Sequence, residues 1–378
     1  MRWPRTVTIR TESRRALWEL IDLLGEVDRR WASPEWRLSS EADVFGAHRA
    51  LMHILEGGLG GVFESDPSRP DFRRIVSPSR KFTGDNPDAI YYDAPVSGDR
   101  EYIVRGNRDG AVYVSVTVEV GSEDGAMPSR TAGVLNDTQF DVESDGSFEI
   151  RVGGRARDRN WLALDAQASR ITTRHYYENE LPAAADPRRS PALTIEVVDP
   201  GPPPPPPDDD SVAAGIRRVA RFVRSRTLEQ PPMAEAELPA FVSIVPNRFP
   251  APALPGDFGL AAFDAAYSMA PYVIGPGQAL VVEGRWPACR CANVSLWNRH
   301  QQTYDYTSRR VSLNRRQTLL RDDGSFQMVI AERDPGVPNW LDSEGKPFGI
   351  VFWRFMLPEG EIETPSAEVV PFDRIGNR

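Results

Sequence analysis

Two short segments of the 378-residue chain carry side chains that are suited to moving protons on a small molecule. The first segment, TGDNPDAIYY, places two carboxylates and an amide before two tyrosines. A carboxylate base and a phenol donor within a few residues are groups that general acid–base chemistry uses. In the structural alternative, Asn86 and Asp88 cap backbone amides of a turn and Tyr91 fills the core. We expect functional roles above all for Asp85, Asn86 and Tyr92.

The second segment, TTRHYYENE, has the composition of a strand that carries polar groups on both faces. Because successive side chains of a strand point to opposite faces, Arg174 and Tyr176 share one face and His175 lies on the other. The imidazole of His175 titrates near neutral pH, which suits a general acid or base. In the alternative, His175 is a half-buried histidine without chemistry, and Arg174 pairs with a buried acid as part of the fold.

Together the two segments predict one site in which His175 or Asp85 transfers a proton. The residues that we expect to bind and orient the ligand are Asn86, Asp88, Tyr92, Arg174 and Tyr176. Such a site would belong to a cofactor-independent hydrolase, lyase or isomerase that acts on a hydroxylated or lipid-like small molecule. The alternative is a noncatalytic protein that binds a carbohydrate or another ligand, or that serves as an assembly scaffold.

Motifs of the common cofactor and metal enzymes are absent from the sequence. There is no His-Glu-x-x-His helix, no Gly-x-Ser-x-Gly turn, no phosphate-binding loop and no dinucleotide fingerprint. Of only four histidines, His48 and His53 are five residues apart on a predicted helix, so their side chains diverge. We therefore expect no metal and no cofactor, and surface or core roles for these two histidines.

The amino-acid composition argues against some classes of binding partner. A net charge of −9 argues against a nucleic-acid-binding protein, because phosphate binding depends on clustered positive charge. Lys81 and Lys346 are the only lysines, and the excess of arginine is typical of a GC-rich genome. Cys289 and Cys291 are predicted to be free thiols, and the chain has no apolar stretch of membrane-spanning length and no apolar signal core. These features predict a cytoplasmic protein that binds a small molecule, and they leave a homo-oligomer open.

The elements that must position these residues are repeated along the chain. The turn motif DGSF begins at Asp145 and returns 178 residues later at Asp323. DAIYYDAP at Asp88 and DAAYSMAP at Asp264 are 176 residues apart, and two copies of NWL are 179 apart. Ordered matches with slowly drifting offsets indicate a diverged tandem duplication. Because Asp88 and Tyr91 recur in the second copy, the structural alternative is favoured for these two residues.

Hydrophobic periodicity predicts a helix at residues 12–31 and an amphipathic helix at the head of each repeat, followed by short strands bounded by Gly, Pro, Asp and Asn. Six consecutive prolines between the repeats predict a stiff spacer. The fold class that follows is mainly β, with two tandem homologous antiparallel β-sandwich or jelly-roll domains. The predicted divisions are a helical segment (1–40), the first domain (41–200), the linker (201–210) and the second domain (211–378).

The segments GDNPDAIYYDAP, DGSF, NWL and KPFGIVFWRFMLPEGEIETP resemble the bacterial family called domain of unknown function 1214. The segment NPDAIYY is similar to the companion family 1254. The resemblance covers most of the chain from about Leu51 to the end and implies β-sandwich or jelly-roll domains. It implies no established reaction and no catalytic residue. The sequence itself does not define the reaction, the substrate or the oligomeric state, and divergence of polar loop residues between the repeats favours an enzyme only slightly.

Overall fold

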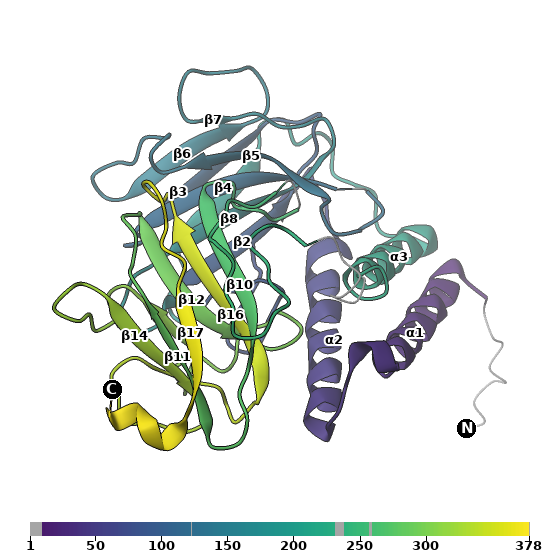
Figure 1. Cartoon of the computed structure of the whole chain (residues 1–378). Coiled ribbons are helices and arrows are strands. Elements are labelled where there is room, and N and C mark those ends of the chain that lie inside the picture. The colour runs from purple at the N-terminus through teal and green to yellow at the C-terminus, as the bar shows by residue number, and fades with distance from the viewer. Residues whose placement is uncertain (1–9, 122, 231–237, 257–258, 378) are drawn as a thin grey trace.

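Three long helices and four β-sheets make up the structure, a computed structural model that describes residues 10–121, 123–230, 238–256 and 259–377 (Figure 1). About 30% of the chain is strand and 20% is helix. The prediction of two β-rich halves is confirmed, but the helices make the fold a mixed α and β structure rather than a mainly β one.

Each long helix begins at a side chain that satisfies its first free amides. Helix α1 (Glu12–Trp31) is capped by Thr11, and it buries residues spaced three and four apart, from Ala16 to Trp31. Helices α2 (Glu41–Val62) and α3 (Asp209–Arg226) begin with reciprocal capping boxes. A short 3₁₀-helix, η1 (Pro34–Trp36), lies between α1 and α2.

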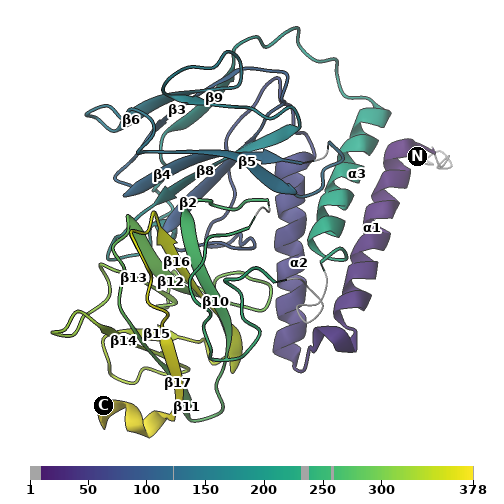
Figure 2. The ribbon, with the colours of Figure 1, turned by 45° about the horizontal axis from the view of Figure 1, so that its top comes forward.

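The three long helices lie side by side in one layer, with α3 between α1 and α2 (Figure 2). Arginines of α3 hold the layer together: Arg217 binds Glu12 and Glu19 of α1, and Arg218 donates to the carbonyl oxygens of residues 62 and 63 at the end of α2. The helix that heads the second repeat is therefore part of a helical layer that it shares with the first.

The first half consists of two sheets that enclose an apolar core, which includes Ile90, Val116, Phe148 and Ile171. One sheet has the order β1-β2-β8-β4-β5 and the other β7-β6-β3-β9. Their strands are β1 (Arg73–Arg74), β2 (Ala89–Pro95), β3 (Tyr102–Asn107), β4 (Tyr113–Val120), β5 (Arg130–Asn136), β6 (Ser147–Val152), β7 (Trp161–Leu162), β8 (Ala168–Tyr176) and β9 (Leu193–Val197). The short 3₁₀-helix η2 (Ala183–Ala185) follows β8.

The second half has two sheets, β10-β16-β12-β13 and β15-β14-β11-β17, which repeat this order without a counterpart of β1. Its strands are β10 (Ala265–Val273), β11 (Gln278–Gly284), β12 (Cys291–Trp297), β13 (Ser312–Asn314), β14 (Phe326–Ala331), β15 (Trp340–Asp342), β16 (Phe348–Met356) and β17 (Ser366–Pro371), and η4 (Phe372–Asn377) ends the described chain. Position by position, β10 to β17 repeat the arrangement of β2 to β9. Among the strands named here, the expected antiparallel pairing has one exception in each half, because β6 with β7 and β14 with β15 are parallel.

The halves meet through the sheets that contain β8 and β16, and the contact repeats with approximate two-fold symmetry. Asn314 of the second half donates to Asp88 of the first, and Asn136 of the first donates to Asp264 of the second. These four residues occupy equivalent places in the two repeats. The interface therefore buries the outer faces of both central sheets.

The proline-rich stretch at residues 202–207 is exposed and lies outside helices and strands. It connects β9 to α3 along the edge of the molecule (Figure 2). Residues 1–9 of the predicted 1–40 segment lie outside the described residues.

Candidate functional site

Asp85, which we expected to transfer a proton, lies in the interface between the halves. It is 3% exposed, and its carboxylate accepts hydrogen bonds from the backbone amide and the hydroxyl of Thr303, at 2.7 and 2.6 Å. Burial raises the pKa of Asp85, against the opposing effects of the Lys81 ammonium and of Thr303. Both carboxylate oxygens therefore hold a loop of the second half.

Asn86 and Asp88 are also occupied by contacts with the second half. Asn293 donates to the amide oxygen of Asn86 at 2.6 Å and to Asp88 at 2.9 Å. Asn86 in turn accepts the backbone amide of Asp88 at 3.0 Å, as the capping alternative describes. Burial raises the pKa of Asp88 to about 6, although the bonds from Asn293 and Asn314 oppose this shift.

Arg174 and Tyr176 share the outer face of the same sheet, as strand alternation predicted. The guanidinium of Arg174 donates to Thr117 at 2.8 Å and to the carbonyl oxygen of Leu260 at 3.0 Å, and it lies 3.7 Å from the buried carboxylate of Glu119. This is the fold-related pairing with a buried acid that the sequence suggested. Tyr176 accepts a hydrogen bond from Tyr91 at 3.4 Å.

His175 and Tyr92 lie on the opposite, inner face of that sheet. His175 is fully buried, and its Nε2 is 3.3 Å from the carbonyl oxygen of Asn107. Burial lowers the pKa of His175 to about 4, so its imidazole is neutral at pH 7. Tyr92 bonds to the hydroxyl of Ser190 at 2.9 Å. The sheet thus separates His175 from Asp85, and the two do not converge on one ligand.

A small cavity lies at the interface between the halves, with about 10 Å³ of room for a water-sized molecule. Two of the predicted ligand-binding residues, Asp88 and Tyr176, line it together with Arg354 and Cys291. Arg354 is the counterpart of Arg174 in the second half, and its guanidinium donates to the carbonyl oxygen of Gly84 at 2.6 Å. The polar groups of this cavity serve the contact between the halves.

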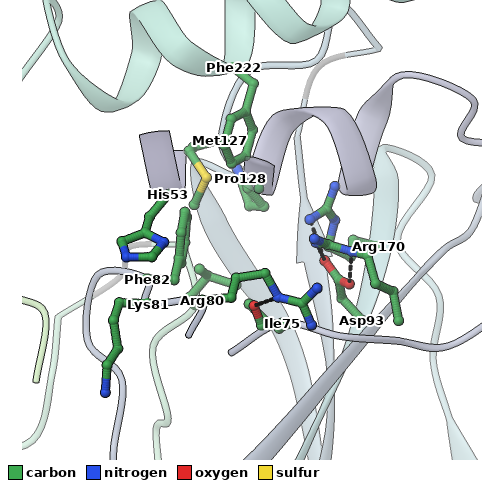
Figure 3. A pocket seen from close by; sticks show the side chains of 13 residues that line it. His53, Ile75, Arg80, Lys81, Phe82, Asp93, Met127, Pro128, Arg170 and Phe222 are labelled. Atoms are coloured by element: carbon green, nitrogen blue, oxygen red, sulfur yellow. Dashed lines mark hydrogen bonds and ion pairs between the residues drawn. The ribbon is translucent and has the colours of Figure 1, made fainter. Parts of the chain in front are cut away.

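A second cavity lies between the helical layer and the first half (Figure 3). We call it the helix–sheet cavity. The space of about 400 Å³ between its atoms includes open solvent, and about 20 Å³ of it is room for a water-sized molecule. The two helices contribute His53 and Gly57 (α2) and Phe222 (α3) to its lining. The sheet that contains β1, β2 and β8 contributes Arg73, Asp93 and Arg170. The remaining lining residues come from neighbouring loops: Ile75, Arg80, Lys81, Phe82, Met127, Pro128 and Leu260. None of the seven predicted site residues lines it.

One wall of the helix–sheet cavity is apolar. The rings of Phe82 and Phe222 stack with their centroids 6.0 Å apart, and Met127 and Pro128 lie beside them (Figure 3). Gly57 faces both rings, because a Cβ atom at that position would be in van der Waals contact with Phe82, at 3.4 Å, and with Phe222, at 3.5 Å. A ligand with an apolar body would be complementary to this wall.

The other wall carries charge. The Asp93 carboxylate accepts two hydrogen bonds from Arg73, at 3.2 and 2.9 Å, and one from Arg170 at 2.5 Å. Arg80 donates to the carbonyl oxygens of Ile75 and Arg74, at 3.2 and 2.6 Å. The ammonium group of Lys81 points away from the cavity and donates to Thr303 at 3.0 Å (Figure 3).

His53 borders the cavity across from Arg170 and Asp93 (Figure 3). Its side chain is 8% exposed, and its Nε2 is buried without a hydrogen-bond partner among the described residues. Burial, and secondarily the charge of Arg49, lowers the pKa of His53, which keeps the imidazole neutral at pH 7. A buried nitrogen without a partner is costly, and a ligand or a water molecule in the cavity would satisfy it.

Sequence reasoning missed this cavity because its lining comes from segments far apart in the chain. The helical spacing of His53 and Gly57 was a usable signal, since residues four apart share one helix face and glycine leaves space there. His48, by contrast, is exposed and bonds to Asp28 of α1. Within the part of the chain that the structure describes, no group of three or more His, Cys, Asp and Glu side chains is arranged to hold a metal ion.

The fold and these sites define a duplicated protein with two β-rich halves and a helical layer. The model of the family described as "Protein of unknown function (DUF1214)" matches residues 91–180 and 282–360, one segment in each half. The resemblance to the companion family 1254 stays a prediction. No curated protein matches the chain.

A solved structure of an uncharacterized protein from Burkholderia cenocepacia has the same fold, with a TM-score of 0.83 and 24% identity over 96% of this chain and 98% of that one. A protein from Vibrio parahaemolyticus is more distant, with a TM-score of 0.49 and 13% identity over 85% of this chain and 98% of that one. None of the described helices is both long and apolar enough to cross a membrane.

Proposed function

We propose that the protein is a noncatalytic binding protein that holds a small molecule with an apolar body in the helix–sheet cavity. The observation that carries the proposal is the combination of an apolar wall, built around Phe82 and Phe222, with the unpartnered buried nitrogen of His53. Apolar walls that carry a few polar groups are typical of ligand-binding sites.

The contacts of the acid–base candidates support binding over catalysis. Asp85, Asn86 and Asp88 are engaged with the second half, and His175 is packed between the two sheets of the first. A general base must come within hydrogen-bond reach of the proton that it removes. Groups that are enclosed and already bonded are poorly placed for this work.

The proposal is tested by isothermal titration with two single-ring probes, phenylacetate and phenylacetamide. We expect at least one probe to bind, and Gly57→Leu to weaken its binding at least tenfold because the leucine enters the space beside Phe82 and Phe222. Gly46→Leu is the matched control, since Gly46 lies on the same helix with nothing within 4 Å of an added Cβ. The proposal fails if neither probe binds, or if Gly57→Leu and Gly46→Leu have equal effects.

We also propose that the two halves are homologous β-sandwich domains, at about residues 41–200 and 211–378, joined by the proline-rich linker at 201–210. The shared sheet order of the two halves supports a duplication. The packing of α3 against α1 and α2 supports a helical layer common to both domains.

A further inference from the structure

We infer that the ligand of the helix–sheet cavity is a monocarboxylate, held through its carboxylate group by Arg73 and Arg170. This inference rests on the proposed function and narrows it to one chemical class. Its basis is a charge imbalance among three neighbouring side chains on the charged wall.

Asp93 is the only described carboxylate that forms an ion pair with Arg73 or Arg170. One negative charge therefore faces two guanidinium groups. These side chains are 5%, 22% and 14% exposed, respectively, so water screens the surplus positive charge only in part. A surplus charge in a largely buried site is costly unless a counter-charge is bound nearby.

The end of α2 offsets part of this charge. Arg170 donates to the carbonyl oxygen of Gly61 at 3.2 Å, in the last turn of the helix, where the backbone dipole is negative. That partial charge is about half of an elementary charge, so a positive remainder persists. A single negative charge from a ligand would complete the balance.

The arginines also retain hydrogen-bonding capacity. Arg73 uses Nε and Nη2 for Asp93, and Arg170 uses Nη1 for Asp93 and Nη2 for Gly61. Among the described residues, Arg73 Nη1 and Arg170 Nε have no hydrogen-bond acceptor. Because guanidinium groups suit the planar geometry of carboxylates, two free donors and one surplus charge favour a monocarboxylate.

Arg80 adds positive charge at the same cavity but is committed to structure. It binds two backbone carbonyl oxygens and lies 3.5 Å from Glu56. Its role is to shape the wall, and the ligand's carboxylate is assigned to Arg73 and Arg170. The apolar body of the acid would then extend toward Phe82 and Phe222.

Isothermal titration of the full-length protein at low ionic strength tests the chemical class. We expect phenylacetate to bind at least tenfold more tightly than phenylacetamide, its neutral isostere, and more tightly than phenyl phosphate, which carries more charge than the site balances. If phenylacetamide binds as well as phenylacetate, the inference fails and the proposed function survives. If phenyl phosphate binds best, the ligand class is wrong. If no probe binds, the proposed function fails as well.

Substitutions test whether Arg73 and Arg170 cause the preference for phenylacetate over phenylacetamide. We expect Arg170→Met to leave a balanced Arg73–Asp93 pair and to abolish the preference for phenylacetate over phenylacetamide. Arg73→Met is the second variant, at the more exposed of the two arginines, and should act in the same way. Arg105→Met is the matched control, because Arg105 pairs with Glu149 and Glu196 on the surface of the first half, and it should retain the preference.

Asp93→Asn separates binding from a structural role of the three side chains. We expect this variant to enlarge the surplus positive charge, and phenylacetate to raise its melting temperature more than it raises that of the unchanged protein. A merely structural role predicts that Asp93→Asn and Arg170→Met both reduce the effect of phenylacetate. That outcome, or a preference for phenylacetate that survives the loss of either arginine, would overturn the inference.

Discussion

His175 illustrates what the sequence can and cannot say about one residue. Strand alternation correctly separates its side chain from those of Arg174 and Tyr176. Strand alternation does not show whether either face of β8 meets solvent. In the structure neither face does, because the second half covers the outer face, and the residues from Ile171 to Tyr176 are all buried. A histidine that looked half-exposed is therefore a core residue.

Acid should destabilise the protein through His175. Its pKa is about 4 in the folded chain against an ordinary 6.5, so between these values the unfolded chain binds the proton more readily. Stability is therefore lost as pH falls from 6.5 toward 4, by about 2–3 kcal/mol at pH 4.5 for this one group. His175→Gln should lose that much less stability between pH 7 and pH 4.5, as measured by urea unfolding.

Other groups with shifted pKa values also affect stability in this range, and comparing the two proteins cancels their contributions. Burial lowers the pKa of His53, and it lowers that of His300 to about 4; both shifts act in the same direction as the shift of His175. The raised pKa of Asp88 acts in the opposite direction, because the folded chain then binds a proton that the unfolded chain releases. All of these groups are present in the unchanged protein and in His175→Gln. Equal losses of stability in the two proteins would show that His175 is not the acid-sensitive group.

Asp85, Asn86 and Asp88 lie together in the structure, but their sequence does not indicate which groups they bind. The TGDNPDAIYY segment does form a cluster of buried, bonded groups. Their partners, Thr303, Asn293 and Asn314, lie more than 200 residues away in the chain. Polar side chains that fasten two halves together have the same composition as those of an active site.

Among the elements, α2 connects the helical layer to the helix–sheet cavity. Helical periodicity predicted α1, α2 and α3, because capping residues and apolar spacing are local signals. The packing of α3 between α1 and α2 was not predicted. Arg217 and Arg224 of α3 bind glutamates of α1, and Arg218 binds a carbonyl oxygen at the end of α2, contacts that no local signal in the sequence indicates.

Two glycines of α2, Gly46 and Gly57, test which face of this helix borders the ligand. Gly57→Ala and Gly46→Ala should each stabilise the protein by about 0.5–1 kcal/mol, because alanine costs less conformational entropy than glycine in a helix and neither new Cβ meets a close contact. Only Gly57→Ala should also weaken the binding of phenylacetate. Chemical denaturation and titration measure the two effects. Destabilisation by Gly57→Ala, or weaker binding in Gly46→Ala, would contradict the account of this helix face.

At the scale of the whole molecule, the sequence predicted the repeat and the structure shows how the repeats are joined. Matching offsets anticipated equivalent strands, since insertions between them are short. The approximate two-fold interface, with Asp88 and Asp264 in equivalent places, depends on side chains that face each other across two separate sheets. The helix–sheet cavity likewise forms only when both helices of its wall reach the first half. No single segment of the sequence therefore predicts the two-fold interface or the helix–sheet cavity.

A crystal structure of the protein grown with 4-bromophenylacetate is the most direct test of the central claim. We expect an anomalous bromine peak in the helix–sheet cavity beside Phe82 and Phe222, with the carboxylate within hydrogen-bond distance of Arg73 or Arg170. A bromine peak at the interface between the halves or on the surface, with the helix–sheet cavity free of the probe, would contradict it.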